Sequence, residues 1–517
     1  MQLTPAQIQA LDLLQEKQFL LVHGITGSGK TEIYLQAAAR TIADGKQVII
    51  LVPEIALTPQ TTQRFAERFP IAVLHSALTP KERQENWQKI INAEVQLVVG
   101  ARSALFAPFK NLGLIVIDEE QDSSYKQDNN PRYHTVQTAL QRARLCGAKV
   151  LLGTATPALE TFHLFQNPPD KRYGYIYLPE RINNRPLPPV EIVDLRAELQ
   201  NGNFSVLSKR LQTELRECLN TQGKAILFLN RRGFASFINC RSCGLVLECP
   251  HCSVALVYHA DTNQAKCHYC GHTQNVADKC PSCHSGYFKF FGTGTQRVES
   301  ELKKIFGDVH IFRMDSDTTT KRGAHEKILK EFLAADKAVL LGTQMIAKGH
   351  DFPEVTLIGI ISADTLLNLP DFRSAERTFQ LLAQVAGRTG RGNRSGKVIV
   401  QTYNPEHYAI QAAAEHNYQK FYEQELTQRQ EVNYPPFSKL TLIVFSAKEE
   451  ILAKNMAAQY AQKYAGQASG PTPAIIYKLR GFYRWQILLK DVQVNYSDFP
   501  AESKVKIEID VDPLNMY

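Results

Sequence analysis

The sequence predicts an α/β protein with two tandem parallel-sheet lobes, a Cys-rich insertion in the second lobe and a small α+β C-terminal domain. Three observations lead to this prediction. Short apolar runs alternate with helical stretches in two successive series, as in layered α/β folds. A cluster of eight cysteines interrupts the second series after its first strand. Beyond residue 430 the pattern changes to several strands with one helix.

The first lobe is expected over residues 1–180. Its apolar runs have the length and composition of buried parallel strands. They lie at residues 19–22, 48–52, 95–99, 114–117 and 150–152, with helical stretches such as 31–44 and 60–69 between them. A Pro-rich stretch at residues 183–189 is expected to link this lobe to the next.

The second lobe is expected over residues 181–430, with the insertion at 238–290. Its predicted strands lie at residues 225–229, 309–312, 338–341, 357–361 and 397–400. The insertion is too small and too polar to hold a core unaided, so we expect metal ions to order it. The C-terminal domain is expected over residues 431–517, with strands at 440–445, 475–479, 485–489 and 505–511 and a helix near 449–464.

The composition indicates a globular protein and disfavours several other classes. The 517 residues are 44% hydrophobic and 21% charged, which are ordinary values, and this length suits about three domains. The sequence has no apolar run of membrane-spanning length and no evident secretory signal. Paired cysteines indicate metal in a reducing compartment, so we expect a cytoplasmic protein without membrane contact. The net charge of +8 mildly favours a polyanionic partner.

A phosphate-binding loop follows the first predicted strand and reads Gly24-Ile25-Thr26-Gly27-Ser28-Gly29-Lys30-Thr31. The strand before it and the helical stretch after it are the context that this motif needs. Backbone N–H groups of the loop would hold the β-phosphate of ATP, and Lys30 would reach the β- and γ-phosphate oxygens. Thr31 would ligate Mg²⁺. A Gly-rich turn without a ligand is the alternative, and the flanking elements disfavour it.

Two further sets of residues predict a hydrolytic site. Asp118 and Glu119 end a predicted buried strand, where Asp118 suits Mg²⁺ binding and Glu119 is placed to activate the attacking water. Arg388 and Arg391 lie three residues apart in the second lobe and share one helix face. They would stabilise charge on the transferring γ-phosphate, as an arginine finger does. A solvated acidic turn and a generic basic helix are the alternatives.

Four Cys-x-x-Cys pairs between residues 240 and 283 predict two structural zinc sites. The pairs are Cys240/Cys243, Cys249/Cys252, Cys267/Cys270 and Cys280/Cys283. Two tetrahedral all-cysteine sites use all eight thiolates, and the spacing alone does not fix which pairs share a metal ion. The rival ligands are His251, His268, His272 and His284. Redox-active dithiols are a poorer alternative.

The polar stretch after the two carboxylates interleaves aromatic and basic residues, namely Tyr125, Lys126, Arg132, Tyr133 and His134. Such interleaving suits stacking on bases and contact with phosphates, and stacking contributes roughly 1–3 kcal/mol per base. We therefore expect a loop that senses a single-stranded nucleic acid, with an ordinary surface loop as the alternative. Weaker candidates for backbone contacts are Arg102, Lys348 and His350.

Six sequence blocks resemble, in order, those of the superfamily 2 helicases with two RecA-like lobes, and specifically those of the PriA family of replication-restart helicases. The blocks are residues 51–58, 99–106, 118–127, 153–157, 342–351 and 372–378. Asp122-Ser123-Ser124-Tyr125-Lys126-Gln127 and the eight-cysteine block are the most specific parts. The resemblance runs from about residue 3 to the C-terminus.

The resemblance implies an ATP-dependent 3′→5′ DNA helicase of the primosome, which remodels stalled replication forks and helps to reload the replicative helicase. It implies Gln7 as an adenine-reading side chain, because an amide can satisfy both edges of adenine; a surface helix glutamine is the alternative. It also implies nested zinc sites, with an inner set of Cys249, Cys252, Cys267 and Cys270 and an outer set of Cys240, Cys243, Cys280 and Cys283.

The implied partners are forked and single-stranded DNA, single-stranded-DNA-binding protein, and the primosome and helicase-loader proteins. We expect the chain to act as a monomer. Family members usually carry an upstream region that grips the 3′ end of a nascent strand and includes a winged-helix domain. The chain is therefore expected to be a fragment or a member without that region.

One residue of the nucleotide site departs from the family pattern. Gln121 occupies the fourth place of a block that usually reads Asp-Glu-Glu-His. This position couples ATP hydrolysis to DNA binding, and a glutamine can still donate and accept hydrogen bonds there. Two other functions stay open on the sequence: a translocase or RNA remodeller with little strand separation, and a DNA-binding assembly platform.

Overall fold

The computed structural model of the chain separates into two compact units. Unit 1 contains Met1–Leu187 and Met345–Phe352, and unit 2 contains Pro188–Gln344 and Pro353–Tyr517. The structure describes residues 3–53, 59–182, 185–229, 238–252, 254–259, 262–286, 288–290, 295–307, 309–315, 318, 324–343, 346, 352, 354–389, 396–500 and 503–516. Among these residues, no helix has the length and apolarity that a membrane crossing requires.

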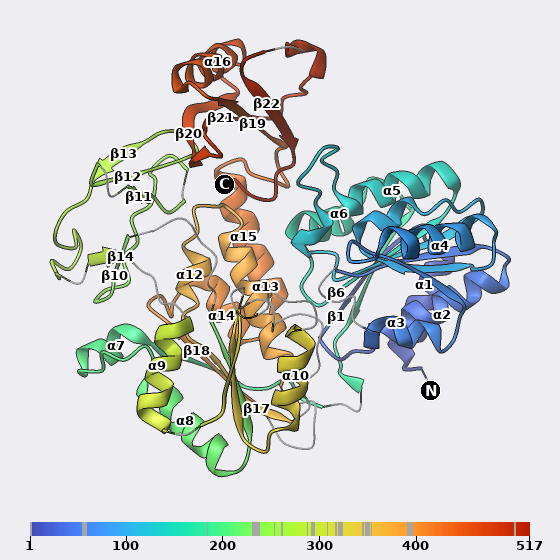
Figure 1. The fold of residues 1–517 in the computed structure, drawn as a ribbon, viewed down its shortest axis with the longest axis horizontal. Helices are drawn as coiled ribbons and strands as arrows, with labels where there is room; N and C mark the ends of the chain where they lie inside the picture. Colours follow the sequence, from blue (N-terminus) through green and yellow to red (C-terminus); the bar gives the residue numbers. More distant parts are fainter. Residues whose placement is uncertain are drawn as a thin grey trace. The chain divides into compact units, whose positions relative to one another are not determined.

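Unit 1 is built on a seven-stranded parallel sheet, blue to teal in Figure 1, with the strand order β3-β4-β2-β5-β6-β1-β7. The strands are β1 (Phe19–Gly24), β2 (Gln47–Leu51), β3 (Ile71–Leu74), β4 (Leu97–Gly100), β5 (Leu112–Asp118), β6 (Lys149–Thr154) and β7 (Tyr173–Leu178). The helices are α1 (Pro5–Glu16), α2 (Lys30–Ala43), α3 (Pro59–Ala66), α4 (Pro80–Ile91), α5 (Thr135–Cys146) and α6 (Leu159–Gln166), with the 3₁₀ helices η2 (Arg102–Phe106) and η3 (Ser123–Tyr125).

Helices cover both faces of this sheet (Figure 1). On one face, Leu11 of α1 and Ile33 of α2 share a fully buried core with Val22 of β1 and Val116 of β5. The parallel order brings the carboxyl ends of β5, β6 and β1 to the same edge of the sheet. Ligands of open parallel sheets bind at this edge, and the phosphate loop, Asp118 and Thr154 all lie there.

Unit 2 contains a second parallel sheet, of six strands in the order β15-β16-β9-β17-β18-β8. The strands are β8 (Val190–Asp194), β9 (Lys224–Phe228), β15 (Ile311–Met314), β16 (Ala338–Gly342), β17 (Val355–Ile360) and β18 (Lys397–Thr402). The helices around it are α7 (Leu195–Gln200), α8 (Lys209–Asn220), α9 (Thr295–Phe306), α10 (Ala324–Ala334), α12 (Asp364–Leu367), α13 (Ser374–Ala386), α14 (Tyr408–Ala414) and α15 (Tyr418–Glu431).

The remaining parts of unit 2 are antiparallel. Between β9 and α9 lie the short strands of the Cys-rich insertion, which are β10 (Ile238–Cys240), β11 (Val257–His259), β12 (Gln264–Lys266), β13 (Thr273–Asn275) and β14 (Phe288–Phe290). The C-terminal sheet, in the order β20-β21-β19-β22, packs on α16 (Glu450–Lys463). Its strands are β19 (Leu440–Ala447), β20 (Ala468–Leu479), β21 (Phe482–Lys490) and β22 (Lys506–Val511), with the 3₁₀ helix η5 (Tyr496–Asp498).

This architecture confirms the predicted fold class of two parallel-sheet RecA-like lobes, a Cys-rich insertion and an α+β C-terminal part. The sequence prediction omits β3, β7 and β8, which are all edge strands. An edge strand contacts fewer neighbours, so it need not be a continuous apolar run. Every residue of β8 is only half-buried, and β7 alternates tyrosine with other residues.

Candidate functional site

The phosphate loop joins β1 to α2 in a conformation that requires glycine. Gly27 and Gly29 have φ values of +89° and +81°, in the left-handed region. A Cβ on Gly29 would lie 2.4 Å from Nε2 of Gln7 and 2.8 Å from Cδ1 of Ile182, so a larger residue would displace both side chains as well as strain the backbone. The Lys30 ammonium donates a hydrogen bond to the Gly24 carbonyl oxygen over 2.7 Å, which folds this side chain back over the loop.

The loop has the donor groups that a phosphate needs. The Ser28 hydroxyl is buried and has no hydrogen-bond partner within the described parts of the chain. Gly29 is the N-cap of α2 and provides no side-chain cap, so the first N–H groups of the helix face the loop. Buried polar groups usually find a partner, and phosphate oxygens would accept from both the hydroxyl and the N–H groups. The residues present therefore fit a nucleoside polyphosphate.

Asp118 ends β5 beside two buried tyrosines. Tyr34 of α2 donates a hydrogen bond to Asp118 Oδ1 over 2.8 Å, and Tyr125 donates to the Asp118 carbonyl oxygen over 2.7 Å. Burial, together with the negative charge of Glu119, raises the pKa of Asp118 to about 6, against the opposing charge of Lys30. A carboxylate oxygen in this position suits a hard divalent cation.

Glu119 and Gln121 form a short chain of hydrogen bonds with the end of β6. Gln121 Nε2 donates to Glu119 Oε2 over 2.8 Å, and Gln121 Oε1 accepts from the Thr154 hydroxyl over 2.6 Å. Thr154 in turn accepts from the Thr156 backbone N–H over 3.0 Å. Glu119 itself has φ +49°, an uncommon conformation that often marks functional positions. The unusual glutamine thus fixes the rotamer of the candidate catalytic carboxylate.

Gln7 lies against the phosphate loop. It is 3% exposed, and its Nε2 donates to the carbonyl oxygens of Ser28 and Gly29 over 3.3 Å each. Its Oε1 accepts from the Thr4 N–H over 2.9 Å, as part of the capping box of α1. In this structure the amide therefore contacts the loop backbone, whereas the sequence expectation assigned it to adenine.

The two arginines of the second lobe follow α13. Arg388 is half-buried, and its N–H donates to the Val385 carbonyl oxygen over 3.1 Å as the helix ends. The neighbouring Thr389 is buried and donates to the Val355 carbonyl oxygen over 2.6 Å. Arg391, the second expected arginine, lies outside the described residues, and so does Lys348.

The first residues of the expected DNA-sensing loop are buried within unit 1. Tyr125 is 0% and Lys126 is 4% exposed, so neither presents its side chain at the surface as the sequence expectation required. Arg102 holds the loop from η2, since its guanidinium donates to the carbonyl oxygens of Ser124 and Lys126. Tyr133 is only half-buried, and so is Arg132. The Tyr133 ring contacts the ring of the exposed Phe106 edge-to-face, with centroids 5.1 Å apart.

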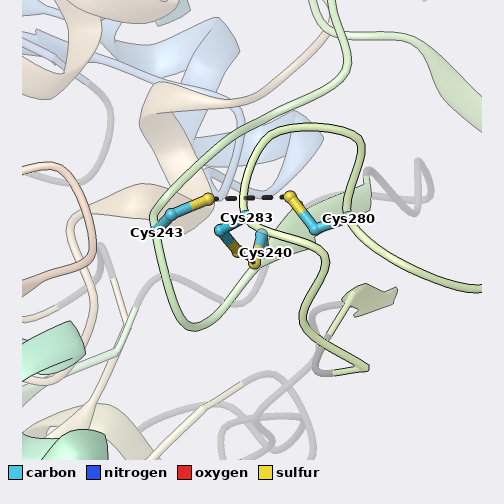
Figure 2. A group of neighbouring side chains, drawn as sticks. All are labelled: Cys240, Cys243, Cys280 and Cys283. Atoms are coloured by element: carbon cyan, nitrogen blue, oxygen red, sulfur yellow. Dashed lines mark hydrogen bonds between the residues drawn. The ribbon is translucent and has the colours of Figure 1, made fainter.

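The eight paired cysteines gather into two sets of four in the insertion. One set is Cys240, Cys243, Cys280 and Cys283, drawn in Figure 2, and the other is Cys249, Cys252, Cys267 and Cys270. Within each set the sulfurs all lie within 4.8 Å of one another. Nearest sulfurs are 3.5 and 3.6 Å apart, which suits the roughly 3.8 Å edge of a tetrahedral zinc–thiolate site.

This grouping is the nested one that the resemblance implies, and the sequence spacing alone left it open. Turns of the same kind support both sites. Gly244 and Gly271 have positive φ, and their N–H groups donate to the carbonyl oxygens of Cys240 and Cys267 over 2.7 and 3.0 Å. No histidine of the described residues joins either set. The insertion therefore contains two Cys₄ zinc-binding sites.

Each zinc site contacts a different part of unit 2. Beside the outer site, Arg241 donates to the Tyr403 hydroxyl over 2.9 Å, just after β18. Beside the inner site, the His268 carbonyl oxygen accepts from Thr472 and Gln486 of the C-terminal sheet over 3.0 and 2.8 Å. Tyr269 of the inner site also accepts from the Phe372 N–H over 3.3 Å. The insertion thus connects the parallel sheet to the C-terminal domain.

Several residues at these sites escape sequence reasoning. Tyr34 and Thr154 act through contacts that only the folded chain creates. Glu120 is 1% exposed, and its carboxylate accepts from the Ala158 N–H and the Thr161 hydroxyl over 2.7 and 2.9 Å. It thereby caps α6, the helix that follows β6. In the sequence, only its position between Glu119 and Gln121 indicates that Glu120 belongs to the site.

Four protein-family models match the chain. They are the DEAD/DEAH box helicase at residues 4–165, the PriA DNA helicase Cys-rich region domain at 249–274, the helicase conserved C-terminal domain at 288–393 and the primosomal protein N C-terminal domain at 430–514. Among solved structures, RecG bound to a three-way DNA junction is similar, with a TM-score of 0.48 and 17% identity over 83% of this chain and 47% of that chain.

Curated relatives cover nearly the whole chain, and they are named replication restart protein PriA. The Bacillus subtilis protein is 47% identical over 98% of this chain, and the Synechocystis protein is 47% identical over 100% of it. The chain spans 65% of the length of each of these two relatives. The Treponema pallidum protein is 42% identical over 96% of this chain and 77% of its own length. At this identity and coverage, the chain belongs to the family of the replication restart protein PriA.

Proposed function

We propose that this protein is an ATP-dependent DNA helicase that acts in replication restart. The observation that carries the proposal is the combination of two features in one chain. Unit 1 joins a glycine-dependent phosphate loop to Asp118 and Glu119 at one edge of a parallel sheet. Unit 2 carries two four-cysteine sites inserted into a second parallel sheet.

In this proposal the residues of the nucleotide site have separate roles. The loop from Gly24 to Thr31 and the ammonium of Lys30 bind the phosphates of ATP. Thr31 and Asp118 would hold Mg²⁺, which supplies charge neutralisation between the phosphate groups. Glu119 accepts the proton of the attacking water, and Arg388 and Arg391 stabilise the transferring phosphoryl group from the second lobe.

We further propose 3′→5′ unwinding of forked DNA with single-stranded DNA as the track. The net charge of +8 supports a polyanionic partner. Arg132, Tyr133 and Lys348 remain proposed DNA contacts. Arg102 donates hydrogen bonds to the loop, and Tyr125 and Lys126 are buried within it. We therefore assign these three residues an indirect role in linking DNA binding to hydrolysis.

The cellular setting is also a proposal. The protein would act as a cytoplasmic monomer. Its partners would be single-stranded-DNA-binding protein, primosome proteins and the loader of the replicative helicase. Membership of the PriA family supports this setting. We likewise propose functional boundaries at residues 1–180, 181–430 and 431–517, with the zinc insertion at 238–290. The family models that match residues 4–165 and 430–514 support the first and third parts of this division, whereas the contact units keep the C-terminal residues together with the second lobe and assign residues 345–352 to unit 1.

The test compares ATP turnover and strand separation by the purified chain. We expect single-stranded DNA to stimulate ATP hydrolysis, and a fork with a free 3′ tail to be unwound in preference to one with a 5′ tail. Lys30→Ala should abolish both activities. Turnover stimulated by RNA alone, or turnover without unwinding, would favour a remodeller or translocase. DNA binding without any turnover in the parent chain would favour an assembly platform.

A further inference from the structure

Four successive carbonyl oxygens of the phosphate loop accept hydrogen bonds from outside the motif. The guanidinium Nε of Arg181 donates to Thr26 over 3.1 Å, and the backbone N–H of Ile182 donates to Gly27 over 3.0 Å. The carbonyl oxygens of Ser28 and Gly29 both accept from Gln7 Nε2. The donors come from two separate segments, the start of α1 and the segment after β7.

These contacts determine the direction of the loop's N–H groups. In a planar trans peptide, the carbonyl group and the following N–H point in opposite directions. When a donor fixes the carbonyl of residue 26 on the outer side of the loop, the N–H of residue 27 must point to the other side. The same reasoning applies to the N–H groups of Gly29 and Lys30, whereas the Ser28 N–H donates to the Ile25 carbonyl oxygen over 3.0 Å within the loop. A loop held in this way presents its N–H groups before any phosphate arrives, so less ordering is needed on binding.

Arg181 is well placed for this role. It is 5% exposed, and its Cγ lies 3.5 Å from the position of a Cβ on Gly27, so its aliphatic stem covers that glycine. Burial, with the charge of Arg185 nearby, lowers the pKa of the Arg181 guanidinium. The end of β7, just before Arg181, also contacts the start of the phosphate loop, since the Leu178 carbonyl oxygen accepts from the Ile25 N–H over 3.2 Å.

We propose that Arg181 is a positioning residue of the nucleotide site, which acts with Gln7 to hold the phosphate loop in its anion-binding conformation. The ligand that depends on it is the polyphosphate part of the nucleotide. In this assignment Gln7 also supports the loop. The inference rests on the proposed ATP-dependent activity and adds two outer supports to its binding site.

The experiment measures the affinity of the full chain for ATP, for GTP and for inorganic tripolyphosphate, which has no base. Arg181→Met keeps the aliphatic stem and removes the donor. We expect it to weaken binding of all three ligands by the same factor, about tenfold, as for loss of one buried hydrogen bond. Arg181→Lys should recover part of the loss. Arg172→Met is the matched control, because Arg172 pairs with Asp170 at the surface.

Steady-state kinetics separate positioning from general stability. A loop-positioning role predicts a higher KM for ATP in Arg181→Met with a smaller change in kcat and an unchanged melting temperature without ligand. A lower melting temperature with unchanged KM would overturn the proposal, since Arg181 would then be only structural. If Arg181→Met fails to fold, the affinities of Arg181→Lys and Arg181→Gln decide the question by the same comparison.

Gln7→Ala tests the second support. Equal losses for ATP, GTP and tripolyphosphate agree with the loop role, whereas a loss for ATP alone would assign Gln7 to adenine and overturn that part of the inference. If the parent chain binds no nucleotide, the proposed function itself fails. If the parent binds nucleotide and Arg181→Met binds equally well, only the inference about Arg181 fails.

Discussion

Gln121 donates a hydrogen bond from Nε2 to Oε2 of Glu119 over 2.8 Å. The same side chain accepts from Thr154 at the end of β6, so it fixes the carboxylate relative to a neighbouring strand. A glutamine is neutral at every pH, whereas a histidine in this place, as the resemblance leads us to expect, can gain a charge near neutrality. The contact therefore positions Glu119 without adding a titrating group beside it.

Gln121→Ala should lower kcat for ATP hydrolysis with little change in nucleotide affinity. Loss of a hydrogen bond to a charged group corresponds to a decrease of about ten- to a hundredfold. Rapid-kinetic measurement of ATP turnover with single-stranded DNA present provides the test. Gln121→His is the matched variant and should restore most of the rate near neutral pH. Wild-type turnover in Gln121→Ala would contradict a positioning role.

Nucleotide binding in the presence of Mg²⁺ should depend on the ionisation of Asp118. Its pKa is raised from 3.8 to about 6 by burial and by Glu119, so the folded protein holds a proton in this window that the unfolded chain has released. The contribution of this group to stability therefore falls as pH rises from about 4 to about 6. Mg²⁺-dependent affinity should rise over the same window, because the cation needs the carboxylate.

Affinities measured with Mg²⁺ and with EDTA between pH 5 and 8 test this expectation. Asp118→Asn should remove the Mg²⁺-dependent part of the pH profile. Tyr34→Phe removes the donor to Oδ1, so the midpoint should move to higher pH. An unchanged profile in Asp118→Asn would show that another group titrates.

Loss of one zinc site should affect one docking surface of the insertion. Cys252→Ser disrupts the inner site, and we expect faster hydrogen exchange near Thr472 and Gln486 of the C-terminal sheet. Cys243→Ser disrupts the outer site, and exchange should instead increase near Tyr403. Zinc binding to such sites contributes on the order of 10 kcal/mol, so the local change should be large.

Elemental analysis provides the control for this pair of variants. The parent chain should contain two zinc ions, in keeping with its two four-sulfur sets, and each variant about one. Identical exchange patterns in the two variants would contradict separate docking roles. One zinc ion in the parent chain would contradict the two-site assignment itself.

Arg429→Met should destabilise unit 2 strongly. The guanidinium of Arg429 pairs with Glu376 of α13 over 2.5 Å and with Glu425 over 2.7 Å, and its side chain is 2% exposed. Its removal takes away the cation that these two buried carboxylates share, which costs about 3–5 kcal/mol. Chemical denaturation measures the loss. The matched control is Lys420→Met, whose pair with Glu415 is exposed and contributes about 1 kcal/mol or less.

The clearest functional signals in the sequence are local ones. The phosphate loop, the carboxylates after a buried strand and the four cysteine pairs are each defined by a few neighbouring residues. Their chemistry depends on residue type and short spacing, which the chain carries before it folds. The buried strands β1, β2 and β5 are recognisable for the same reason, because a strand covered on both faces must be apolar throughout.

Tertiary contacts decided the roles of the amphipathic residues. Tyr125 and Lys126 resemble a surface loop in sequence, yet the hydroxyl of Tyr125 reaches the Asp118 carbonyl oxygen in the interior. Gln7 and Arg181 are distant in sequence from the phosphate loop. They contact its carbonyl groups because β7 pairs with β1 and α1 packs on the sheet that contains both strands. A long polar side chain is compatible with either surface or interior.

By itself, the sequence determined the fold class and the zinc chemistry of this protein, because apolar runs and clustered ligands act over short distances, and it predicted the hydrolytic groups for the same reason. Only the tertiary structure decided which cysteine pairs share a site, how Gln121 holds Glu119 and which residues support the phosphate loop. The physical reason is that hydrogen bonds and metal sites depend on distances of a few ångströms between segments far apart in the chain.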